Sequence, residues 1–196
     1  LAGVYKEMGA IAKSIETNLK AKDIYENADT SKLPAPQIRQ LNGLKATLYN
    51  SIAGNYLSMK EYEVAGEYYQ LAYDDMMRNE DYLSAGIILM NLGELQYRQE
   101  QYESALSTYA KAQVLLEQDH RKVPRQMWLM EVNVGNTALA IGDFEKALLM
   151  FEAALEKFQN PKDNQGLVLS YTGLGNLYLK LEDYTAANDY CQKAFA

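Results

Sequence analysis

The chain has 196 residues, of which 48% are apolar, so it is long enough to bury a core and we expect it to fold. Its 26 acidic side chains exceed its 19 basic ones and give a net charge of -7, which disfavours binding to nucleic acid because a backbone binder needs a concentrated basic face. No apolar run reaches the roughly 18 residues of a membrane span, and the N-terminus lacks the layout of a signal peptide. We therefore expect a cytoplasmic chain without direct membrane insertion.

A pattern of small and aromatic residues recurs five times along the chain. It begins with an alanine, has an aromatic residue four positions later and ends with a second alanine three positions after that. The leading alanines are Ala21, Ala65, Ala105, Ala147 and Ala187, and the aromatic positions hold Tyr25, Tyr69, Tyr109, Phe151 and, in the last copy, Cys191. Twelve positions before the leading alanines stand Gly9, Ala53, Gly93, Gly135 and Gly175. The chain is therefore built from an internal repeat.

Each copy of the repeat predicts a pair of helices. Offsets of three, four and seven residues place side chains on one face of an α-helix, and the small residues allow two helices to approach closely. In chain order, we expect hairpins over residues 2–32, 36–80, 81–119, 124–160 and 163–196, which gives about ten helices and no strands in one continuous domain. Because the chain starts at Leu1 instead of methionine, we interpret it as a piece of a longer protein.

The turn inside each hairpin has its own signal. An aromatic residue stands three positions before the leading alanine in four copies, at Tyr62, Tyr102, Phe144 and Tyr184, whereas the first copy has Asn18 there. Between hairpins, we expect loops around Pro34, Asn79, Pro124 and Pro161, since proline and asparagine are typical of turns.

Segments such as "NLGELQYRQEQYESALSTYAKA" and "GLGNLYLKLEDYTAANDYCQKA" resemble tetratricopeptide repeats. The resemblance implies an all-α fold, a right-handed α-α superhelical solenoid of about five hairpins, whose first helices line a concave groove for a protein or peptide. The leading alanines are 44, 40, 42 and 40 residues apart, and Met77 and Glu117 replace the proline that often closes the common 34-residue form. The chain thus resembles the longer-period subgroup of this family.

Mapping the concave face onto this sequence predicts a set of partner-binding residues. They are Asn50, Met90, Asn91, Glu94, Tyr97, Arg98, Asn133, Asn136, Leu139, Asn176 and Lys180. Asparagine recurs among them, and its amide can donate to and accept from a peptide backbone. The alternative is that these amides join neighbouring helices or face water. Tyr97 and Arg98 are the expected energetic anchors, because these residue types dominate binding hot spots.

Other chemistry receives a structural interpretation. His120 has no second histidine or cysteine cluster beside it to complete a metal site, and the sequence "GLG" at 173–175 lacks the context of a dinucleotide motif. We interpret the carboxylate pairs Asp74–Asp75 and Glu182–Asp183 as solvated surface and most tyrosines as core. We therefore expect no enzyme activity, no cofactor and no metal.

The sequence leaves two functions open. The first is a non-catalytic module that binds a protein or peptide segment, helical or extended, in its groove. The second is the sensory or regulatory region of a bacterial signalling protein such as a histidine kinase, a diguanylate cyclase or a transcription regulator. An apolar C-terminal end with Tyr190 and Phe195 also suggests an end-to-end homodimer.

Overall fold

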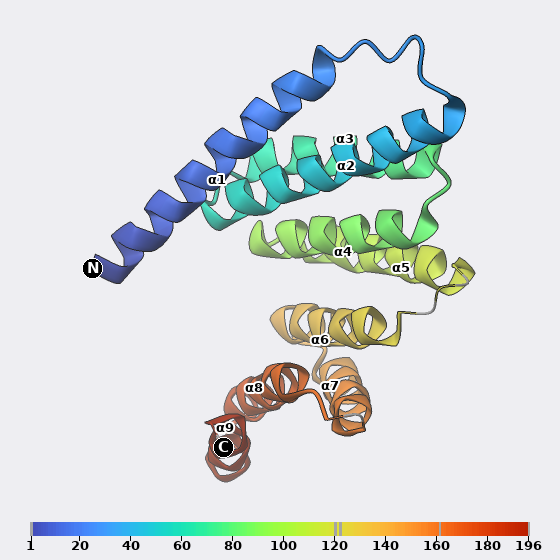
Figure 1. Cartoon of the computed structure of the whole chain (residues 1–196). Helices are drawn as coiled ribbons and strands as arrows, with labels where there is room; N and C mark the ends of the chain where they lie inside the picture. The colour runs from blue at the N-terminus through green and yellow to red at the C-terminus, as the bar shows by residue number, and fades with distance from the viewer. Residues whose placement is uncertain (1, 120, 122, 161, 196) are drawn as a thin grey trace.

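A computed structural model describes residues 2–119, 121, 123–160 and 162–195, and all regular structure in these ranges is helical (Figure 1). The all-α class is therefore confirmed. The described ranges contain nine helices, which are α1 (Ala2–Glu26), α2 (Ala35–Ser58), α3 (Tyr62–Arg78), α4 (Tyr82–Arg98), α5 (Tyr102–Gln118), α6 (Pro124–Ala140), α7 (Phe144–Gln159), α8 (Asn164–Lys180) and α9 (Tyr184–Phe195).

Eight of these helices form four hairpins that stack in chain order. The hairpins are α2–α3, α4–α5, α6–α7 and α8–α9 (Figure 1). First helices also contact the first helices of neighbouring hairpins, whereas successive second helices make no such contact in the described ranges. An array whose first helices adjoin is curved toward them, so α2, α4, α6 and α8 form its inner wall.

The prediction of a first helical hairpin over residues 2–32 is wrong. Residues 2–26 form the single helix α1, which runs through the predicted turn at Asn18 and packs across α2 (Figure 1). This segment contains no glycine or proline at the turn, and Lys20 pairs with Glu16 one helical turn away at 2.6 Å. Helix continuation is favoured where nothing in the sequence stops it, because each added residue completes another backbone hydrogen bond.

Five of the later turns share one backbone geometry. The residue two positions before the next helix has positive φ: Lys60 at 64°, Glu80 at 57°, Glu100 at 61°, Gly142 at 83° and Glu182 at 61°. In the turn after α4, the N–H of Gln101 donates to the carbonyl of Gln96 at 2.9 Å. This left-handed cap ends one helix and aims the chain back along it.

Small residues and aromatic rings hold the hairpins together. Phe151 of α7 is fully buried between Gly135 of α6 and Gly173 of α8, where an added Cβ would lie 2.7 and 2.4 Å from its ring. Tyr109 of α5 packs on Gly93 of α4 in the same way, at 2.5 Å. Glycine at these positions lets helix backbones approach a flat ring directly, so the repeat signature is a packing signature.

Ion pairs connect the loops of neighbouring hairpins. Arg121 forms a two-contact pair with Asp119 at 2.8 and 2.7 Å and reaches Asp81, which caps the start of α4. Arg125 in the first turn of α6 contacts Asp163, the cap of α8, at 2.6 Å. These contacts link the starts of three first helices and so fix the spacing of the inner wall.

Candidate functional site

The predicted binding residues lie on four first helices. Asn50 is on α2, and the others are on α4, α6 and α8. Ten of the eleven are at least partly accessible, while Met90 is only 8% exposed. The inner wall therefore presents most of the predicted set toward one side of the array.

Five of the predicted residues meet in one open hollow of about 620 Å³, which we call the wall hollow. Its lining comes from α4, α5, α6 and α8 and consists of Tyr97, Tyr102, Asn136, Leu139, Ala140, Asn176, Leu179 and Lys180. The hollow spans the inner edges of three successive hairpins. Its position follows from the stacking, because equivalent ends of the first helices come together at the turns.

Two aromatic rings form one side of the wall hollow. The rings of Tyr97 and Tyr102 lie 5.7 Å apart between centroids and are tilted by 56°. Burial raises the pKa of Tyr97, and the neighbouring Tyr102 adds to this effect. Tyr97 is therefore a neutral hydroxyl on an aromatic surface, which can pack against a side chain and still bond a backbone group.

The remaining lining is aliphatic and amide in character. Leu179 is 55% exposed and adds an apolar contact to the wall hollow. Asn136, Asn176 and Lys180 surround it with hydrogen-bond donors and acceptors. Apolar side chains surrounded by polar groups also occur in protein–protein interfaces, where a polar rim encloses an apolar centre.

Asn50 and Asn91 make a contact of a different kind. The side-chain amide of Asn91 donates to the amide oxygen of Asn50 at 2.9 Å, joining α4 to α2. For this pair, the alternative in which the amides join neighbouring helices is the one that the structure contains. No such side-chain bond involves Asn133, Asn136 or Asn176 in the described residues.

Three other predicted residues, all on α4, make contacts inside the chain. Met90 packs in a core cluster with Ala105 and Tyr109, so it supports the wall from behind. The carboxylate of Glu94 accepts from the guanidinium of Arg98 at 2.7 Å, one helical turn away. Arg98 is thus a charge-neutralised neighbour of the wall hollow, and it is not among the residues that line it.

Sequence reasoning missed three residues of the wall hollow. Tyr102 was assigned to turn packing, and Ala140 and Leu179 were outside the predicted set. Leu179 carried a usable signal, since it stands next to Lys180 at the polar end of α8 and on a face where other copies have Tyr97 and Leu139. The repeat register therefore places Leu179 at the position that Tyr97 and Leu139 occupy in their own copies.

One carboxylate was misinterpreted as solvated surface. Asp75 is only 3% exposed and contacts Lys45 of α2 at 3.4 Å and Arg78 at 2.7 Å. A buried carboxylate in a helix–helix seam needs such partners, so Asp75 is part of the hairpin α2–α3. The interpretation of the "GLG" sequence as helix packing is confirmed, since Gly173 lies within α8 and packs against Phe151 of α7. His120 lies outside the described residues.

The described residues contain neither a cluster of potential metal ligands nor a helix that could span a membrane. Within residues 2–119, 121, 123–160 and 162–195, no three His, Cys, Asp or Glu side chains are grouped so that they could hold a metal ion. Over the same part of the chain, every helix is too short or too polar to cross a bilayer.

Comparisons with known proteins identify the same repeat. The sequence matches the tetratricopeptide repeat family over residues 44–118 and 126–196. It is 26% identical over 146 residues to the human intraflagellar transport protein 88 homolog, a match that covers 74% of this chain and only 17% of that protein. The chain therefore spans about a sixth of the length of this relative.

Two solved structures share the fold. The crystal structure of BtubC (BKLC) from P. vanneervenii has a TM-score of 0.74 and 21% identity, covering 99% of this chain and 75% of that one. A crystal structure of a putative kinesin light chain from Podosopora anserina, with nearly identical TPR-like repeats, has a TM-score of 0.66 and 13% identity, covering 99% and 90%. At these sequence identities, both similarities show a shared fold and nothing more.

Proposed function

Since the chain belongs to the tetratricopeptide-repeat family, whose domains bind other proteins, we propose that its inner wall holds a segment of a partner protein over the wall hollow. The observation that carries this proposal is the meeting of Tyr97, Asn136, Leu139, Asn176 and Lys180 around one open space. Such domains are usually non-catalytic, and we propose the same for this one.

The chemistry of the wall hollow favours a segment with an apolar side chain and an accessible backbone. Tyr97, Tyr102 and Leu179 offer contact area for the side chain. Asn136 and Asn176 can bond the backbone beside it, because an amide both donates and accepts. A helical segment would form these bonds with the backbone groups at its end, and an extended segment would form them with backbone groups along its whole length.

The pairing of Asn50 with Asn91 narrows the proposed surface. Breaking that bond to capture a partner would cost about as much as the new bonds return, since folded hydrogen bonds contribute roughly 0.5–1.5 kcal/mol each. The free amides lie farther along, on α6 and α8. We therefore place the principal contacts between α4 and α8 and leave α2 as a flank.

We also propose that the chain is one continuous array of the longer-period subgroup. Its repeat spacing of 40–44 residues supports this assignment, as does the fold shared with the kinesin light chain structure. The second function suggested by the sequence, a sensory region of a bacterial signalling protein, stays a prediction, because none of the contacts described above distinguishes it.

A peptide-display selection tests the proposal. Random peptides are selected on the intact chain, and the recovered peptides are then measured against a variant in which Tyr97, Asn136 and Asn176 are all changed to alanine. The loss of an aromatic anchor and two amides is expected to weaken most of these peptides by more than about 2 kcal/mol, which is roughly thirtyfold in Kd.

The matched control places the same kind of change on second helices. Val114 of α5 and Leu149 of α7 are 53% and 61% exposed, and alanine at both should leave peptide binding unchanged. Circular dichroism checks that both variants keep their helical content. If the selected peptides bind the triple variant as tightly as the original chain, the inner wall is not the binding surface.

A further inference from the structure

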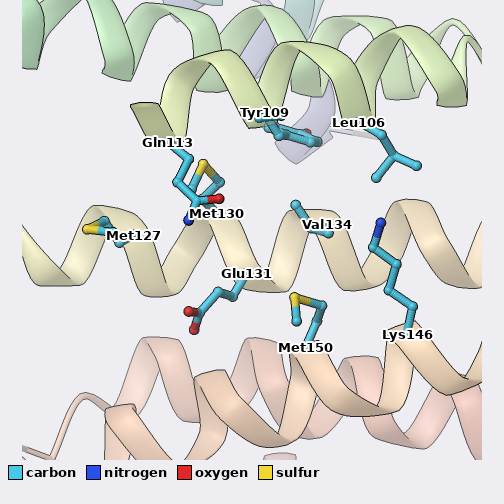
Figure 2. A pocket seen from close by; sticks show the side chains of 10 residues that line it. Leu106, Tyr109, Gln113, Met127, Met130, Glu131, Val134, Lys146 and Met150 are labelled. Carbon is cyan, nitrogen blue, oxygen red and sulfur yellow. The ribbon is translucent and has the colours of Figure 1, made fainter. Parts of the chain in front are cut away.

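A second hollow, of about 290 Å³, lies where α5, α6 and α7 meet (Figure 2). We call it the methionine hollow. Four residues of α6 line it, namely Met127, Met130, Glu131 and Val134. Three other residues of the same helix, Asn136, Leu139 and Ala140, line the wall hollow. At about 100° per residue these two sets point in opposite directions from the helix axis. The methionine hollow is therefore separate from the proposed partner site.

Loose packing at one junction accounts for this space. The contact between α5 and α6 is less extensive than those between α3 and α4 or between α7 and α8, which join the neighbouring hairpins. Leu106, Val134 and three of the chain's eight methionines line the resulting hollow. Methionine side chains are unbranched and adjust their shape to an apolar guest, so these walls suit a ligand of variable outline.

Two charged residues, Glu131 and Lys146, line the methionine hollow, and only Glu131 has an ion-pair partner among the described residues. Figure 2 shows Lys146 extending from α7 toward α5, on the other side of Met150 from Glu131. The carboxylate of Glu131 already pairs with Lys157 through its Oε1. The ammonium group of Lys146 has no ion-pair partner among the described residues, where the backbone N–H of this residue donates to the carboxylate of Asp143. The uncompensated charge at the hollow is therefore positive.

The volume sets the size of the guest. A water molecule takes about 30 Å³ of liquid, so 290 Å³ corresponds to about ten non-hydrogen atoms. An apolar body of this size would bury most of its surface against the methionines. A terminal anion could remain beside the ammonium of Lys146, at the partly open side of the hollow.

We propose that the methionine hollow binds a small amphipathic carboxylate. Its carboxylate pairs with Lys146, and its apolar body lies among Met127, Met130 and Met150. This site is additional to the partner surface, because the two use opposite faces of α6.

Methyl NMR of the methionines tests the proposal directly. The chain is labelled with ¹³C at the methionine methyl groups and titrated with octanoate and, separately, with neutral octanamide. Octanoate should shift the signals of Met127, Met130 and Met150 saturably and leave that of Met59 in place, because Met59 stands at the end of α2, outside the hollow. Octanamide should bind at the same methyl groups about fivefold more weakly, because it lacks the charge.

A charge-matched pair of variants identifies the anion contact. Lys146→Met should weaken octanoate about fivefold, to the level of octanamide, and leave octanamide unaffected. Lys111→Met removes the same charge from an exposed position of α5 outside the hollow and should change neither ligand.

Several results would overturn the assignment. Unsaturable shifts, equal shifts at Met59, or equal weakening by the two lysine variants would remove the site. Tighter binding of a short peptide through its C-terminal carboxylate, at the same methyl groups, would assign the hollow to a protein end instead of a free carboxylate.

Discussion

Replacing Gly173 with alanine tests the close packing that defines the repeat. The added Cβ would lie 2.4 Å from Phe151, whereas ordinary contacts begin at 3.4 Å, so the ring would have to move by about 1 Å. Phe151 is fully buried and is held on its other side by Gly135, which leaves it no free direction. Overpacking of this kind costs about 1–3 kcal/mol, and the better helix propensity of alanine returns about 1 kcal/mol.

We therefore expect Gly173→Ala to lower the free energy of unfolding by up to about 2 kcal/mol. The matched control is Gly43→Ala in α2, where an added Cβ would meet no atom within 4 Å. This second change should raise the free energy of unfolding by about 0.5–1 kcal/mol through propensity alone. Urea unfolding followed by circular dichroism measures both values.

A double variant separates overpacking from other causes. Phe151→Leu removes ring volume at the point of contact, so it should offset part of the loss caused by Gly173→Ala, and the two changes should be non-additive. If Gly173→Ala stabilises the chain as Gly43→Ala does, the packing argument for the glycine positions is incorrect.

Three further changes probe the turns, the seams and the helix caps. Glu100→Gly should raise the free energy of unfolding by about 0.5–1 kcal/mol in urea titrations, because a non-glycine residue at φ 61° is strained. Ala105→Leu should cost about 1–3 kcal/mol in the same assay, since Ala105 has no exposed surface. The N–H of Gly166 and then the guanidinium of Arg125 hold the pKa of Asp163 below its usual range. The folded state thus gains stability from this carboxylate above its ordinary pKa and loses it as pH falls through the lowered value, and Asp163→Asn should flatten that part of a Tm-against-pH profile.

The repeat could be predicted from the sequence because its signal is local and repeated. Tyr69, Tyr109 and Phe151 stand at fixed offsets from small residues, and these offsets translate directly into helix faces. The missing first hairpin shows the limit of this reasoning. Helix faces were present around Asn18, but the turn geometry found at Lys60 and Glu100 was not encoded there.

The candidate site could be predicted only in part. The helix faces identified Tyr97, Asn136 and Lys180, since repeat register decides which side of a helix is turned inward. The bond between Asn50 and Asn91 depends on the distance between two first helices, which one helix's pattern does not contain. The methionine hollow likewise depends on how loosely α5 meets α6.

Site-specific photo-crosslinking shows which face of the array a bound peptide contacts. A photoreactive phenylalanine analogue replaces Leu139 on the inner wall in one variant and Leu149 on α7 in another, and each is irradiated with peptides recovered by display. We expect crosslinked peptide with the analogue at 139 and none with it at 149. Crosslinking at 149 with none at 139 would contradict this expectation.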